Sequence, residues 1–199
     1  MSTALEEMHN IAPHIRVGRA RAGVLMLILS DSLSVVAILA AGGYLSALNT
    51  ENQYRLAADH APTFLPGLLV SLGLLLSGLT YYWWEQRVRK STDAKGSGQP
   101  IIFVISLLLM LAALIGQSWV GATLGYAAPF HAYASLILLL TWFSVVHLLL
   151  AVIVGILLWG RIVRGRLAGH GYIVEVTGYW WYYTVIASVL MWLFSVLIR

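Results

Sequence analysis

The sequence contains no cysteine, and only 10% of its 199 residues carry a charge. The absence of cysteine excludes a disulfide framework, a thiolate metal site and a cysteine nucleophile. The scarcity of charge excludes a soluble globular domain, in which about a quarter of residues are charged. The sequence also lacks the G-x-x-x-x-G-K-[ST], G-x-G-x-x-G, H-E-x-x-H and G-x-S-x-G motifs, so it offers no self-contained active site of these kinds.

Hydrophobic residues dominate instead, at 60% of the chain, with a mean hydropathy of +0.83. They form five apolar runs, each reaching the ~20 residues that a helix needs to cross about 30 Å of hydrocarbon. In lipid every backbone N–H and C=O must be paired within its own segment, so helix is the expected state. We predict one all-α, polytopic membrane domain over residues 1–199, a five-transmembrane-helix bundle with spans at about 22–47, 64–84, 101–124, 132–159 and 172–198.

Lysine and arginine predict the orientation of these spans. Ten of the twelve fall on one side of the membrane if the five spans alternate in direction, and the positive-inside rule assigns that side to the cytoplasm. The bundle is therefore expected to be N-in/C-out, with residues 1–21 as a cytoplasmic segment that lacks the short apolar core of a cleavable signal. The ten are Arg16, Arg19, Arg21, Arg87, Arg89, Lys90, Lys95, Arg161, Arg164 and Arg166.

The net charge of +4 does not predict a nucleic-acid partner, because the basic residues lie at the ends of apolar runs. Two aromatic clusters lie at the same membrane boundary, at residues 81–84 and 179–183. Aromatic belts are typical of the headgroup layer. The residues predicted to contact lipid headgroups are Trp83, Trp84, Arg87, Trp180, Trp181 and Arg161.

Asp31 is the charged residue deepest within a predicted span, about 13 Å from its start at 1.5 Å per residue. A carboxylate at such a depth costs at least ~2.5 kcal/mol on insertion scales, so it must face protein, water or a partner, or stay protonated. Two interpretations remain open. Asp31 either handles a proton or pairs structurally, or it is capped by Ser30 and Ser34 at a helix contact.

His147 lies about 20 Å from the cytoplasmic end of the fourth span, within about two helical turns of the depth of Asp31. The two side chains form a candidate proton-linked or structural pair if the first and fourth spans touch. A haem or metal ligand is the alternative, but one membrane histidine cannot supply two axial ligands, and we predict no metal site. Glu175, near the start of the fifth span, is expected to be solvated.

The chain resembles subunit III of haem–copper terminal oxidases, in the five-helix form found in bacteria, over nearly its whole length, from about Arg21 to Ile198. Residues 22–31 resemble the opening helix of that family, where a glycine precedes an apolar stretch and a Ser-Asp or Ser-Glu pair, which places Asp31 on the intramembrane acid of the family. The sequence at 146–148 matches the second histidine of its H-G-L-H motif, and Tyr179-Trp180-Trp181-Tyr182 resembles its Y-W-H-F motif.

The chain departs from the family pattern at several positions. Ser144 stands at the first histidine of H-G-L-H, Trp181 at the histidine of Y-W-H-F, and Thr184 where the last helix usually carries an aspartate. The third span has Gln117 and Ser118 in place of the glutamates common in relatives. The chain is therefore identified as a divergent member.

The resemblance implies a non-catalytic subunit III of a cytochrome c or quinol oxidase in a prokaryotic cell inner membrane. It implies that the chain binds no cofactor of its own, and that haem and copper lie on partner subunits, above all the catalytic subunit I. It also implies structural phospholipids between the helices and a role in core stability, proton uptake and, through the complex, proton translocation. The alternatives are a transporter or channel subunit, or the membrane anchor of another respiratory complex.

Overall fold

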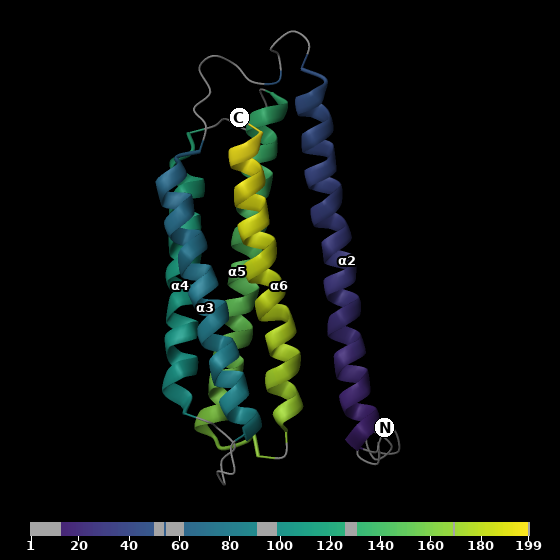
Figure 1. Cartoon of the computed structure of the whole chain (residues 1–199), viewed down its shortest axis with the longest axis vertical. Helices are drawn as coiled ribbons and strands as arrows, with labels where there is room; N and C mark the ends of the chain where they lie inside the picture. The colour runs from purple at the N-terminus through teal and green to yellow at the C-terminus, as the bar shows by residue number, and fades with distance from the viewer. Residues whose placement is uncertain are drawn as a thin grey trace, which may run out of the picture.

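The computed structural model describes residues 13–49, 54, 62–90, 99–125, 131–168 and 170–198, which are mostly helical (Figure 1). Their five long helices are each apolar enough to span a membrane, with mean hydropathies from 1.5 to 2.6 over the most apolar window. The predicted all-α class and five spans are therefore confirmed, whereas the orientation in the membrane stays a prediction. The helices are α2 (Pro13–Ala47), α3 (Phe64–Lys90), α4 (Pro100–Thr123), α5 (Ala132–Val163) and α6 (Gly171–Leu197).

Several helices extend past the apolar runs into polar sequence. α2 begins at Pro13, and α3 continues to Lys90 through a last turn that is rich in basic residues. Helical hydrogen bonding does not need apolar side chains, and cations near a helix C-terminus complement its negative end. The predicted N-terminal segment is therefore divided: residues 13–21 belong to α2, and residues 1–12 lie outside the described residues.

Four of the helices form a closed bundle, and α2 lies at its edge (Figure 1). α3 packs against α4 and α6, and α5 packs against the other side of the same two helices, whereas α2 contacts only α6 and α5. Over the most apolar window, 6% of the residues of α2 are buried, compared with 50% of those of α5. α2 therefore presents most of its apolar surface outward.

Aromatic side chains fill the core of the bundle near the basic ends of α3 and α5. Tyr81 stacks on Trp181 with ring centroids 5.0 Å apart, and the rings of Trp84 and Phe103 lie 4.5 Å apart. All four side chains are fully buried. The indole N–H of Trp181 donates to Oγ of Ser77 at 3.2 Å, so this core combines ring packing with satisfied polar groups.

A second core cluster occupies the opposite end of the bundle and includes Val35 of α2, Ile137 of α5 and Met191 of α6. Tyr54, which lies outside the helices, packs edge-on against Tyr133 with ring centroids 5.6 Å apart. Burial, and secondarily the nearby Tyr133, raises the pKa of Tyr54 above its ordinary value of 10.0. The connection between α2 and α3 is thus anchored to the start of α5.

Candidate functional site

Asp31 and His147 meet in the interface between α2 and α5. Nε2 of His147 lies 2.7 Å from Oδ2 of Asp31, although the two residues are 116 positions apart in the sequence. The side chain of His147 is 5% exposed and that of Asp31 is 21% exposed. The structure therefore brings together the two intramembrane residues that the sequence analysis had singled out on separate spans.

The hydrogen bonds around this pair restrict where its protons lie. Nδ1 of His147 is 2.7 Å from the carbonyl oxygen of Phe143, and a carbonyl oxygen only accepts, so Nδ1 carries a proton. Nε2 then either donates to the carboxylate as part of an imidazolium or accepts from a neutral carboxyl group. In both arrangements one proton is shared between Asp31 and His147, and the pair has no net charge.

Tyr183 of α6 completes the site, because its hydroxyl donates to Oδ2 of Asp31. The imidazole ring of His147 lies between aromatic rings, with centroid distances of 4.5 Å to Phe143 and 5.8 Å to Trp180. An isolated carboxylate in a span costs ~2.5–3.5 kcal/mol on insertion scales. In a neutral pair with a third hydrogen bond Asp31 is not an isolated charge, and the penalty applies to an isolated charge.

The alternative interpretation, in which Ser30 and Ser34 cap Asp31, is not what the structure shows. The hydroxyl of Ser34 donates to the carbonyl oxygen of Ser30 at 3.4 Å, within its own helix. The hydroxyl of Ser32 likewise donates to the carbonyl oxygen of Ile28 at 2.7 Å. Local hydrogen bonds of this kind are typical of serine in a helix, and the side-chain partners of Asp31 come from α5 and α6 instead.

A network of ion pairs at the basic end links α2, α6 and α3. Nη2 of Arg21 donates to Oε2 of Glu175 at 2.7 Å, and Nη2 of Arg89 lies 4.0 Å from the same oxygen. Arg89 also donates to Oε1 of Glu85 at 2.6 Å, and the hydroxyl of Tyr182 donates to Oε2 of Glu85 at 2.6 Å. Charges therefore alternate along the network from α2 to the bundle core.

This network corrects the expectation that Glu175 is solvated, since its side chain is only 12% exposed. The hydroxyl of Tyr179, one helical turn further along α6, donates to Oε1 of Glu175. Sequence reasoning also missed Glu85, which is buried and paired. The one sequence signal for it is Arg89 four residues later, a spacing at which opposite charges meet on a helix.

The residues predicted to contact lipid headgroups divide into two groups. Trp83 is 53% exposed, and Arg87 and Arg161 are also exposed. Trp84 and Trp181, by contrast, are fully buried, and Trp180 is 9% exposed. The prediction is wrong for these three tryptophans, because successive residues of a helix point about 100° apart and only some can face lipid.

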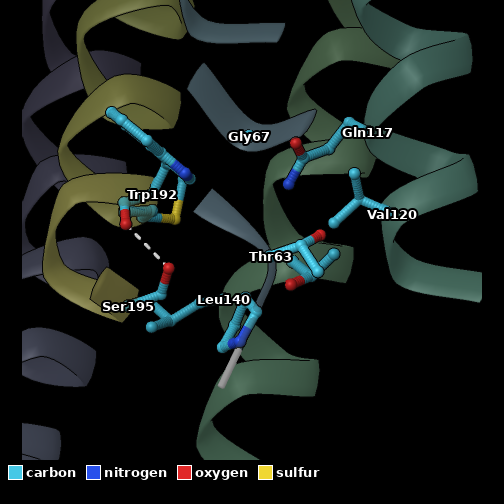
Figure 2. Close-up of a pocket in the computed structure, with 10 residues that line it drawn as sticks. Thr63, Gly67, Gln117, Val120, Leu140, Trp192 and Ser195 are labelled. Atoms are coloured by element: carbon cyan, nitrogen blue, oxygen red, sulfur yellow. Dashed lines mark hydrogen bonds between the residues drawn. The ribbon is translucent and has the colours of Figure 1, made fainter. Parts of the chain in front are cut away.

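A small cavity lies among α3, α4, α5 and α6 at the end of the bundle opposite the ion-pair network, and Figure 2 shows the side chains that line it. Its volume of about 20 Å³ is enough for about one water molecule. Gln117 of α4 and Trp192 of α6 both line it, and the indole nitrogen of Trp192 lies against the backbone of Gly67 (Figure 2). This nitrogen has no hydrogen-bond partner within the described part of the chain.

Three of the positions that depart from the oxidase motifs, Ser144, Trp181 and Thr184, are buried, whereas Gln117 and Ser118 are partly exposed. The hydroxyl groups of Ser144 and Thr184 have no hydrogen-bond partner among the described residues, and the indole of Trp181 belongs to the aromatic core. No group of three or more histidine, aspartate or glutamate side chains in the described segments is arranged to hold a metal ion. The strongest candidate site is therefore Asp31, His147 and Tyr183.

The comparisons with known proteins leave the family open. No protein-family model matches the sequence, and no curated protein is significantly similar to it.

Proposed function

We propose that this chain is the non-catalytic subunit III of a respiratory haem–copper oxidase. The proposal places it beside the catalytic subunit I and other membrane subunits, with haem and copper on those partners. Its contribution would be to stabilise the catalytic core, to bind structural phospholipids and to sustain proton uptake while oxygen is reduced.

The contact between Asp31 and His147 is the observation that supports the proposal most strongly. The resemblance identified the two residues separately, Asp31 from the opening helix and His147 from the motif at 146–148. Their side chains lie 2.7 Å apart, so the two positions that the resemblance matched on separate spans form one site.

The chemistry of the site fits an accessory role in proton handling. The pair holds one shared proton in an uncharged unit, and the hydroxyl of Tyr183 stabilises whichever form carries negative charge on Asp31. Such a site can keep a proton inside the membrane without an isolated charge. It does not by itself form a pathway across the membrane, which agrees with a supporting subunit.

The location follows from the charge distribution. Ten of the twelve basic residues cluster on one side, and within the described structure they gather at the end of the bundle where α2 and α6 begin and α3 and α5 end. We propose that this end is cytoplasmic, with the N-terminus inside and α6 ending outside, in a prokaryotic inner membrane.

The first test is a reduced-minus-oxidised visible spectrum of whatever co-purifies with the chain from its native membrane in mild detergent. Haem bands together with a larger polytopic subunit are expected. An intact preparation without haem would contradict the oxidase assignment and favour a transporter or a scaffold protein.

The second test addresses the site itself. In the purified oxidase complex, Asp31→Asn should leave the haem spectrum unchanged but make activity decline several-fold faster during sustained turnover. Ser34→Ala is the matched control, because Ser34 is on the same helix one turn away and its one hydrogen bond among the described residues stays within that helix. Equal turnover lifetimes for the Asp31→Asn variant and the wild-type complex would show that Asp31 has no role in proton uptake.

A further inference from the structure

The turn that ends α5 gathers three arginines. Gly165 has a φ of +63°, its N–H donates to the carbonyl oxygen of Ile162 at 3.0 Å, and the N–H of Arg166 donates to the carbonyl oxygen of Arg161 at 3.0 Å. This pair of hydrogen bonds defines a Schellman motif. In that motif the positions of Arg161 and Arg166 normally carry apolar side chains that touch each other. Here both are arginine, and Arg164 lies between them in the chain.

These three arginines differ from the paired arginines of the ion-pair network. Arg21 and Arg89 each have a glutamate partner, whereas the side chains of Arg161, Arg164 and Arg166 make no ion pair or hydrogen bond within the described part of the chain. The negative end of a helix favours one nearby cation. It does not explain three cations in one turn that ordinarily joins apolar side chains.

Arg161, Arg164 and Arg166 line a groove of about 660 Å³ between the end of α5 and the start of α6. Leu157 of α5 and Ile173 of α6 contribute apolar walls to it, and Tyr172 adds a phenol. Leu157 is among the exposed large hydrophobic residues. The groove therefore joins a cluster of positive charge to an apolar surface on the outside of the bundle.

We propose that this groove binds an anionic phospholipid, with its phosphate at Arg161, Arg164 and Arg166 and an acyl chain along Leu157 and Ile173. Arginine matches phosphate geometry with two parallel N–H donors, and basic pockets between membrane helices are known to favour anionic headgroups. A free phosphate ion would use the arginines but not the apolar wall, so the lipid accounts for both. The proposal requires only that the helices span a membrane and does not depend on the oxidase assignment.

A second groove at the same end shows why the site on α5 and α6 is the stronger one. It has a volume of about 450 Å³ and is lined by Trp83, Arg87 and Lys90 of α3 with Ile102 of α4. Of the two cations in this groove, Arg87 already donates a hydrogen bond to the side-chain oxygen of Gln99. The groove on α5 and α6, whose three arginines have no partner among the described residues, should therefore retain anionic lipid in preference to this one.

The experiment is native mass spectrometry of the full chain released from nanodiscs of mixed dioleoyl phosphatidylglycerol and dioleoyl phosphatidylcholine. Wild-type protein should retain phosphatidylglycerol selectively. The double variant Arg164→Gln/Arg166→Gln should lose about 30-fold in that selectivity, the equivalent of about 2 kcal/mol at about 1 kcal/mol for each cation near the surface. Added inorganic phosphate should not displace the lipid.

The matched control is Arg16→Gln/Arg19→Gln, which removes the same charge from exposed positions of α2. It should retain the wild-type selectivity, and circular dichroism should show unchanged helix content in both variants. Equal losses in the two double variants would mean a general surface-charge effect and would overturn the proposal. Undiminished selectivity in Arg164→Gln/Arg166→Gln, or displacement of the lipid by phosphate, would overturn it as well.

Discussion

The four-helix bundle and the edge helix α2 are held by different kinds of contact. The bundle interior is an aromatic core around Tyr81, Trp84 and Trp181, whereas α2 buries few side chains and is attached through Arg21 and Asp31. In lipid, apolar surface gains little by leaving the hydrocarbon, so close packing and hydrogen bonds decide which helices associate. The comparison indicates that packing stabilises the bundle and that polar contacts position α2 against it.

The largest effect is expected in the bundle, from Trp181→Ala. The change removes a fully buried indole, its stacking on Tyr81 and its hydrogen bond to Ser77, and should lower the free energy of unfolding by about 3–5 kcal/mol. SDS-induced unfolding in mixed micelles measures this. Trp83→Ala is the control, because Trp83 is exposed and its loss should change stability by less than about 0.5 kcal/mol. Similar losses for the two variants would contradict the distinction between them.

An intermediate effect is expected at the attachment of α2, from His147→Leu. Removing one member of a buried pair leaves the other without its partner, which costs about 3 kcal/mol. The double variant Asp31→Leu/His147→Leu should be more stable than His147→Leu alone, because it leaves no carboxyl group that has lost its imidazole partner. The same SDS titration, run as a double-mutant cycle, gives the coupling. Additive losses would mean that Asp31 and His147 do not interact in the membrane.

The smallest effect is expected from Arg21→Gln, because this guanidinium is exposed and exposed ion pairs are weak. Global stability should not change measurably, but the start of α2 should move more freely relative to α6. Spin labels on Gly18→Cys and Gly171→Cys report this, since a side chain at either position meets no neighbour and the native chain has no cysteine. The distance distribution should broaden in Arg21→Gln, and in wild type at high salt. An unchanged distribution would show that Arg21 does not hold α2.

The sequence was sufficient to predict the helices, because hydropathy over 20 residues reflects a requirement of the bilayer rather than of any particular packing. It was not sufficient to predict which side of a helix faces inward. Trp83 and Trp84 are adjacent residues of the same type at nearly the same depth, yet Trp83 is exposed and Trp84 is buried. That difference depends on helix rotation, which is determined by contacts with other helices.

The candidate site was predictable in part for the same reason. Matched depth indicated that Asp31 and His147 were able to pair, but whether α2 and α5 touch was not encoded in either span alone. Tyr183 belongs to the aromatic cluster at residues 179–183, and every ring in that cluster fitted the prediction of a membrane-interface position. Its hydrogen bond to Asp31, which the sequence did not predict, distinguishes it from the other rings. The pairing of Glu175 was not predictable because its partner, Arg21, lies on a helix more than a hundred residues away in the sequence.

The separation of Asp31 and His147 in the chain also affects how the protein is made. The two residues are 116 positions apart, and a ribosome adding roughly 5–20 residues per second needs on the order of ten seconds to cover that interval. During this time α2 is already synthesised while its partner helices are not. The acid must then wait in its neutral form or beside the insertion machinery, so α2 reaches its final environment only after α5 and α6, which follow it in the chain, have been made.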